Sequence, residues 1–456
     1  MGKKSNVGTE AVYDARSLGG SKMFVLGFQH MFAMFGATVL VPAITGLSVS
    51  TTLLFAGIGT LLFHLLSKWK VPAFLGSSFA FLGGYAAIAP MLESTTQPGV
   101  FNVPNTAMLP YACFGVACAG LVYVILAGLF KFFGAKKVMR YFPPIVTGPI
   151  IICIGLTLSS TAINSCSASW GVALVAIAVV IVCNIWGKGM IKIIPILLGV
   201  VASYIVGAIS GQVNFESIRA AAWIGLPVQW SSTVFGIFTA GNVDTSLLIT
   251  AVVTIVPISL ATMIEHIGDI CAISSTCERN YIQDPGLHRT LLGDGLATSL
   301  AALFGAPANT TYGENTGVLA LSKVYDPAVV RIAACLAILF SFSPKFAAII
   351  SAMPVATMGG VSLVLYGMIS AVGVRNVVEN HVDFTKSRNV IIAALIMVLA
   401  IGVSYSKSGA ISIGSISFSG LAVAAIVGIG LNAILPGKDY VFGEDNQGDT
   451  SVTFKV

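Results

Sequence analysis

Apolar runs long enough to cross a lipid bilayer recur from one end of this chain to the other. The chain has 456 residues, of which 56% are hydrophobic and 9% are charged, and its mean hydropathy is +0.91. A soluble domain carries about 25% charged residues, so this chain has too little polar surface to cover a water-soluble particle. A membrane-spanning helix needs about 20 apolar residues, which is the length of these runs. The sequence therefore predicts an all-α integral membrane protein.

Fourteen of these runs are expected to span the membrane. Polar residues 1–22 precede the first run without an evident cleavable signal peptide, and residues 438–456 form a polar tail. If the chain starts in the cytoplasm and crosses at every run, 21 of its 24 Lys and Arg residues lie on the cytoplasmic side, as the positive-inside rule requires. Both termini are therefore expected to be cytoplasmic. The expected spans are 23–43, 51–67, 74–92, 110–133, 141–161, 169–187, 190–210, 246–274, 290–304, 310–322, 327–350, 353–373, 389–405 and 416–435.

Three short patterns occur twice in the same order, which indicates internal symmetry. GFQH at 27–30 resembles MIEH at 263–266, GSSFAF at 76–81 resembles NTTYGE at 309–314, and PIVT at 144–147 resembles PVAT at 354–357. Seven spans separate each copy from its partner, and an odd number inverts the second copy in the membrane, as in many transporters. We therefore expect two inverted repeats of seven spans.

The second pattern interrupts spans three and ten with β-prone residues that are followed by glycines. Residues 77–81 and 310–313 are predicted to be extended, although two ordinary kinked helices would be the alternative. Extended backbone at membrane depth must be buried in protein or line a wet cavity, so the two segments are expected to pair as short antiparallel strands. A helix that begins after such a break presents N–H groups that can donate to a ligand.

Four acidic residues lie inside expected spans: Glu265, Asp269, Asp294 and Glu314. An acid at the bilayer centre costs about 2.5–3.5 kcal/mol even on a lenient scale. Glu265 and Asp269 are four residues apart and share a helix face. Glu314 follows the break, where the helix dipole favours an acid. No buried Lys or Arg residues match these acids in number, so some of them are expected to carry protons, although Asp269 and Asp294 could instead cross-link helices.

Long stretches of the chain resemble the nucleobase–ascorbate transporter family, and within it the bacterial uracil permeases. The resemblance covers about residues 20–435 and rests on several motifs. These motifs are QHMFAMFGATVLVP at 29–42, GSSFAF at 76–81, EHIG at 265–268, DPGLHR at 284–289, NTTYGEN at 309–315 and MGGVS at 358–362.

This resemblance implies fourteen spans in two inverted repeats that form two domains. A core domain would comprise residues 23–133 (spans 1–4) and 246–350 (spans 8–11). A gate domain would comprise residues 141–210 (spans 5–7) and 353–435 (spans 12–14). The substrate would bind between the broken spans and span eight, and the domains would move against each other to give alternating access. A homodimer through the gate domain is left open.

The resemblance also implies the site residues. The expected substrate-binding residues are Glu265, Glu314, Phe79, Gly313 and Tyr312, where Phe79 and Gly313 act through their backbone amides. Uracil has two N–H donors and two carbonyl acceptors on a flat ring, which two carboxylates and two amides would match. The expected proton-coupling residues are Glu265, Asp269, Asp294, His30 and Asn315, although His30 could equally be a satisfied core histidine.

Two positions depart from the uracil pattern. Asp269 stands where a histidine is expected, and Asp294 stands where a neutral amide is expected. Both acids look like the xanthine and uric acid branch of the family, whereas Glu314 looks like the uracil branch. Glu314 would touch the substrate, so the preferred reading is uracil import by proton symport, with a purine proton symporter as the alternative.

Other function classes fit the sequence less well. An anion carrier should have a basic or neutral site, and the acids argue against it. No metal-ligand cluster, phosphate-binding motif or nucleophile with an adjacent base indicates an enzyme, and the eight cysteines lack metal-site spacing. A passive channel would not need the paired breaks. We therefore expect no cofactor, no metal and no nucleic acid partner, and a location in the bacterial inner membrane.

Overall fold

The computed structural model describes residues 10–93, 101–239, 243–407, 409–413, 416–438 and 440. Most of them are helical, because a helix satisfies its own backbone hydrogen bonds in lipid. The helices are α1 (Gly20–Thr45), α2 (Val49–Leu66), α3 (Leu82–Ile88), α4 (Leu109–Phe133), α5 (Ala135–Met139), α6 (Pro144–Ser167), α7 (Trp170–Ile185), α8 (Met190–Ile193), α9 (Pro195–Ile209), α10 (Phe215–Ala220), α11 (Val234–Thr239), α12 (Thr245–Ile255), α13 (Ile258–Thr276), α14 (Leu287–Leu303), α15 (Gly313–Ser322), α16 (Pro327–Ser341), α17 (Pro344–Ser351), α18 (Val355–Glu379), α19 (Ser387–Ser404) and α20 (Gly420–Ile434).

The strands are short and form three two-stranded antiparallel pairs among the described residues. Two of these pairs were not predicted from the sequence, and one of them takes up the first four residues of the expected last span, 416–435. The strands are β1 (Leu75–Ser77) with β4 (Asn309–Thr311), β2 (Leu92–Glu93) with β3 (Phe101–Val103), and β5 (Ala410–Ile413) with β6 (Ile416–Ser419).

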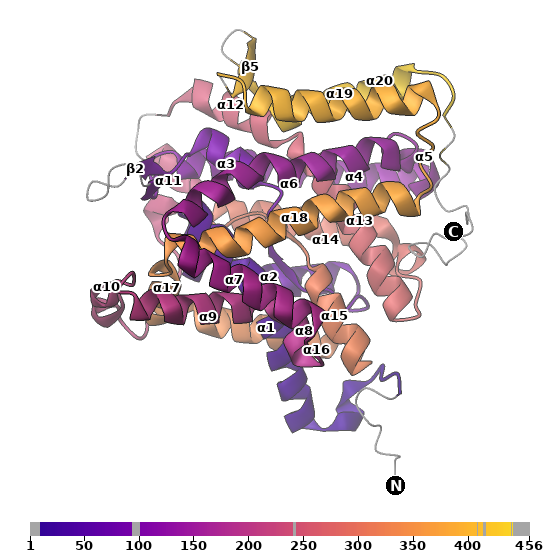
Figure 1. Cartoon of the computed structure of the whole chain (residues 1–456). Helices are drawn as coiled ribbons and strands as arrows, with labels where there is room; N and C mark the ends of the chain where they lie inside the picture. The colour runs from indigo at the N-terminus through magenta and orange to yellow at the C-terminus, as the bar shows by residue number, and fades with distance from the viewer. Residues whose placement is uncertain are drawn as a thin grey trace.

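The long helices stack in layers (Figure 1). Helices α19 and α20 lie side by side at one edge, α6 and α18 cross the middle, and α1 lies with α16 toward the opposite edge. Every expected span overlaps a helix. In the described part of the chain seven helices are long and apolar enough to cross a membrane, or eight if α16 and α17, bent by 87°, form one span. A multi-pass helical membrane fold is confirmed, whereas the fourteen spans, the inverted repeat and the two domains stay predictions.

Strands β1 and β4 confirm that the two broken spans pair with each other. Leu75 pairs with Thr311, Gly76 with Thr310 and Ser77 with Asn309. The strands begin two residues before the predicted 77–81 and one residue before the predicted 310–313, so the predicted limits were wrong. All six paired residues are buried, as extended backbone at membrane depth requires.

Helices α6 and α18 approach each other closely because glycines face the contact. A Cβ atom at Gly155 of α6 would lie 2.2 Å from the carbonyl oxygen of Tyr366, and one at Gly373 of α18 would lie 2.6 Å from the amide nitrogen of Ile152. Small residues allow such contact between membrane helices. The two helices therefore form one continuous wall.

The N-terminal segment, residues 10–19, docks on the ends of three helices. Val12 forms a parallel bridge with Val324, and the phenol of Tyr13 donates to the carbonyl of Cys277 at 3.0 Å. The amide of Ala15 donates to Asp326 Oδ2 at 2.8 Å, while Oδ1 of the same carboxylate accepts from the first turn of α16. The segment thus joins the C-terminal ends of α13 and α15 to the start of α16. Residues 1–9 lie outside the described residues.

Replacing Asp326 by Ala is expected to free this segment. The substitution removes the N-cap of α16, which costs about 1 kcal/mol, together with the hydrogen bond from Ala15. Trypsin should then cut after the exposed Arg16 several-fold faster in purified protein. Asp244→Ala is the matched control, because Asp244 caps α12 without holding the segment. Equal cleavage rates in the two variants would contradict the docking role of Asp326.

Candidate functional site

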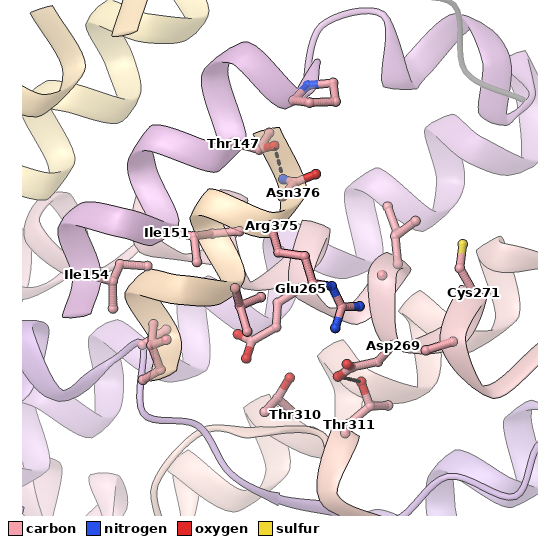
Figure 2. A pocket seen from close by; sticks show the side chains of 18 of the residues that line it. Thr147, Ile151, Ile154, Glu265, Asp269, Cys271, Thr310, Thr311, Arg375 and Asn376 are labelled. Carbon is pink, nitrogen blue, oxygen red and sulfur yellow. Dashed lines mark hydrogen bonds between the residues drawn. The ribbon is translucent and has the colours of Figure 1, made fainter. Parts of the chain in front are cut away.

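The described residues enclose a cavity of about 660 Å³ where the β1–β4 pair meets α13 and the wall of α6 and α18. Figure 2 shows the side chains of these elements pointing into it. The volume lies in the range of small-molecule sites, and most of the lining is apolar with a few polar groups, as such sites are. The cavity is therefore the candidate binding site.

Two backbone amides open onto the cavity directly beyond the strand pair. The amide of Ser78 donates to the carbonyl of Ala308 at 2.8 Å, and the amide of Tyr312 makes the equivalent contact from the other segment at 3.0 Å. The next residues, Phe79 and Gly313, line the cavity, and neither of their amides has an acceptor within the described residues. Two N–H donors thus remain for a ligand, and Gly313 adds the N-terminus of α15.

Tyr312 holds the two segments at a fixed distance. Its hydroxyl donates to the carbonyl of Ser77 at 2.8 Å and accepts from Thr38 Oγ1 at 3.2 Å. Its ring packs over Gly76, where a Cβ atom would lie 2.5 Å from Tyr312 Cε2. The tyrosine also lines the cavity, so it acts on the site through packing as well as contact.

Two acids enter the cavity from one face of α13, as their spacing predicted. Glu265 and Asp269 both line the cavity, and the Glu265 side chain is exposed in it (Figure 2). Asp269 Oδ2 accepts a hydrogen bond from Thr311 Oγ1 at 3.0 Å, which ties α13 to β4. The cavity therefore combines carboxylate acceptors with backbone donors.

Polar residues of α18 that the sequence analysis did not identify complete the lining. Arg375 points into the cavity in Figure 2 and contacts Glu379 Oε1 through Nε at 3.1 Å. Asn376 donates to Thr147 Oγ1 of α6 at 2.9 Å. The expected span ended at residue 373, whereas α18 continues to Glu379, so Arg375 was counted as a loop residue. The apolar run did not indicate the full length of this helix, and for that reason the sequence analysis missed Arg375.

His30 and Asn315 meet each other rather than the cavity. Asn315 Nδ2 contacts His30 Nδ1 at 3.1 Å and donates to the His30 carbonyl at 3.0 Å, which joins α1 to α15. Both residues are buried, and neither lines the cavity. His30 and Asn315 therefore link two helices next to the site.

Asp294 also lies away from the cavity, against His266. Its Oδ2 is 3.3 Å from His266 Nδ1, and both side chains are fully buried. His266 was quoted in a sequence motif but was not expected to contribute to the site. Of the nine expected site residues, the structure thus brings Glu265, Asp269, Phe79, Tyr312 and Gly313 to the cavity. Glu314 lies in the first turn of α15, and its side chain is outside the described part.

Comparison with known proteins identifies the family of this chain. The model of the Xan_ur_permease group, described as Permease family, matches residues 21–409. The chain belongs to this family, the nucleobase–ascorbate transporters. Its relatives are named permeases, so this permease is a transporter rather than an enzyme, as expected.

Individual relatives of this permease match along almost their whole length. It is 42% identical over 438 residues to a uracil permease of Bacillus caldolyticus, which covers 93% of this chain and 95% of that protein. It is 38% identical over 436 residues to a uracil permease of Bacillus subtilis (strain 168), which covers 93% of each chain. The transmembrane domain of a cyanobacterium bicarbonate transporter, BicA, has a TM-score of 0.56 at 16% identity and covers 93% of this chain and 99% of that one. At that identity the likeness shows the fold alone.

Proposed function

We propose that this permease imports uracil together with a proton across the bacterial inner membrane. One observation carries the proposal: the free amides of Phe79 and Gly313 and the carboxylate of Glu265 meet in one cavity. The names of the relatives, uracil permeases, support the same substrate.

The chemistry of uracil fits these groups. Its two carbonyl oxygens can accept from the amides of Phe79 and Gly313, and an N–H of the ring can donate to Glu265. Glu314, one residue beyond Gly313, would take the second N–H. Tyr312 and the Phe79 side chain would border the ring. A site of this kind rejects analogues that leave one of its polar groups unpaired.

Proton coupling would follow from the carboxylates. A carboxylate that is neutralised while it binds substrate at the outer face, and is deprotonated at the higher pH of the cytoplasm, links uracil import to the proton gradient. The core domain, residues 23–133 and 246–350, would carry α13 and the strand pair. The gate domain, residues 141–210 and 353–435, would carry α6 and α18, and movement between the domains would expose the cavity to each side in turn. Both termini would be cytoplasmic, on the grounds of the positive-inside bias.

A purine such as xanthine or uric acid is the alternative substrate. It is favoured by Asp269, which lines the cavity one helical turn from Glu265 and would add a second acceptor there. The volume of about 660 Å³ accommodates either ring system.

Uptake of radiolabelled uracil into proteoliposomes tests the proposal. With acid outside, uracil should accumulate, accumulation should collapse when a protonophore abolishes the gradient, and excess unlabelled xanthine should not compete. Accumulation of labelled xanthine in place of uracil would establish the alternative. Uracil uptake that is indifferent to the gradient would overturn proton symport while keeping the substrate.

A further inference from the structure

A continuous chain of polar side chains leads from the cavity into the buried core. Asp269 Oδ2, on the cavity wall, accepts from Thr311 Oγ1 at 3.0 Å. Thr311 Oγ1 lies 3.3 Å from His266 Nδ1, and the same nitrogen lies 3.3 Å from Asp294 Oδ2. The chain passes through β4, α13 and α14. Figure 2 shows its cavity end, where Thr311 contacts Asp269.

The inner end of this chain is unusual in its hydrogen bonding. His266 and Asp294 are both 0% exposed. Within the described residues, His266 Nε2 and both Asp294 oxygens lack an ordinary hydrogen bond, and the Asp294 carboxylate has the 3.3 Å contact with His266 Nδ1 in its place. Buried polar groups are nearly always hydrogen-bonded, and each exception calls for an explanation.

The groups around the pair are neutral. The phenol of Tyr123 on α4 hydrogen-bonds to Thr262, and the ring of Phe63 on α2 lies edge-on to His266 with the ring centres 6.2 Å apart. No Lys or Arg of the described chain lies within 4 Å of Asp294. Four charged residues, Glu265, Asp269, Arg375 and Glu379, belong to the cavity lining. Without an added proton the pair therefore carries one buried negative charge, which is costly, and one proton would neutralise it.

We propose that His266 and Asp294 store the coupled proton, and that the proton reaches them from the cavity through Asp269 and Thr311. This inference rests on the proposed function and extends its proton coupling to two residues, His266 and Thr311, with distinct tasks. Thr311 is a positioning and relay residue. The His266–Asp294 pair is the store.

A proton from cavity water binds the Asp269 carboxylate. The Asp269 O–H bond breaks as that proton passes to Thr311 Oγ1, while the original hydroxyl proton of Thr311 passes to His266 Nδ1. His266 keeps its Nε2 proton and passes the new Nδ1 proton on to Asp294 Oδ2, 3.3 Å away, which leaves a neutral imidazole beside a neutral carboxylic acid. Asp269 returns to the carboxylate, the pair changes from one negative charge to neutral, and the reverse sequence releases the proton.

Because the His266–Asp294 pair stores the proton, not every acid of this site has to bind and release a proton inside the cavity. Asp269 can return to its charged form beside a bound substrate while the proton is held one layer deeper. Thr311 is the link that makes this exchange depend on the position of β4 against α13.

Paired substitutions at Thr311 test the relay. Thr311→Val removes the hydroxyl at nearly constant shape, whereas Thr311→Ser keeps it. Asp294→Asn removes the store, and Thr290→Val is the control, because Thr290 is a buried residue of α14 whose hydroxyl donates to the Leu287 carbonyl of its own helix. Each variant is reconstituted and assayed for gradient-driven uracil accumulation and for exchange of labelled against unlabelled uracil at equal pH, which needs no net proton transfer.

The ratio of accumulation to exchange is the readout. It should fall about 100-fold in Thr311→Val and Asp294→Asn, the lower range for loss of a positioned proton-transfer group. It should stay at the wild-type value in Thr311→Ser and Thr290→Val. A normal ratio in Thr311→Val, or a parallel loss of accumulation and exchange in Asp294→Asn, would overturn the relay, the latter because it marks a purely structural residue.

A second measurement is independent of the substrate. Infrared difference spectra of the purified protein between high and low pH should contain the C=O band of a protonated buried carboxyl that is missing in Asp294→Asn. Its hydrogen–deuterium exchange should be slower in Thr311→Val than in Thr311→Ser. If wild-type protein fails to accumulate uracil, the proposed function is wrong, while this band still decides the store: its absence at every pH where the protein stays folded would refute it.

Discussion

Glu265→Gln is expected to abolish proton-driven uracil accumulation while the protein remains in the membrane. The amide cannot carry the coupled proton. Its NH₂ group would face the ring N–H of uracil, from which the carboxylate should accept a hydrogen bond. A hydrogen bond to a charged group is worth about 1.5–3 kcal/mol, so uracil affinity should fall about 10–150-fold. Uptake into proteoliposomes and binding of labelled uracil to purified protein measure the two effects.

The control for this prediction is an acid away from the cavity. Glu216 lies in the exposed short helix α10, and Glu216→Gln makes the same chemical change without touching the site. Its uptake should match the wild type. Normal accumulation by Glu265→Gln would remove Glu265 from the proposed mechanism.

Gly76→Ala is expected to destabilise the strand crossing and to remove binding with it. The added Cβ would lie 2.5 Å from Tyr312 Cε2 and 2.6 Å from Thr38 Oγ1, so the tyrosine ring would have to move. Overpacking of this kind costs about 1–3 kcal/mol. Displacement of Tyr312 also shifts Gly313, whose amide is a proposed ligand donor. Thermal unfolding in detergent and uracil binding should both report the loss.

Gly83, a second glycine of the same broken span, is the control position that distinguishes this clash from a general effect of replacing glycine by alanine. A Cβ at Gly83 of α3 would have its nearest neighbour at 3.8 Å, an ordinary contact. Gly83→Ala should therefore keep binding and retain or slightly raise stability, since alanine favours helices. If Gly76→Ala behaved like Gly83→Ala, Tyr312 would be freer to move than its two hydrogen bonds indicate.

Local patterns in the sequence predicted the parts of the fold that depend on local chemistry. The apolar runs located the helices, and the β-prone breaks indicated that two distant segments pair. Their limits were wrong by one to four residues, because the register of a strand is set by its partner. Here the Tyr312 ring over Gly76 and the contact of Leu75 with Thr311 fix it, and neither can be read from one segment alone.

The site was predictable to the extent that its residues are costly in lipid. Glu265 and Asp269 were identified from that cost and from their spacing, and both reach the cavity. Arg375 was missed because α18 continues six residues beyond its apolar run, which hydropathy does not show. The contact between His266 and Asp294 was missed because it joins two helices, and only packing determines which buried acid meets which histidine.

The pairing of β1 with β4 also governs how the protein is made. The ribosome makes β1 early, whereas its partner β4 is made only after every element from α3 to α14. Until then the backbone groups of β1 have no strand to bond, and open strand edges are not tolerated in hydrocarbon. We therefore expect the backbone groups of β1 to bond to other partners, such as water, while the first half of the chain is made, and the strand pair to form only late in synthesis.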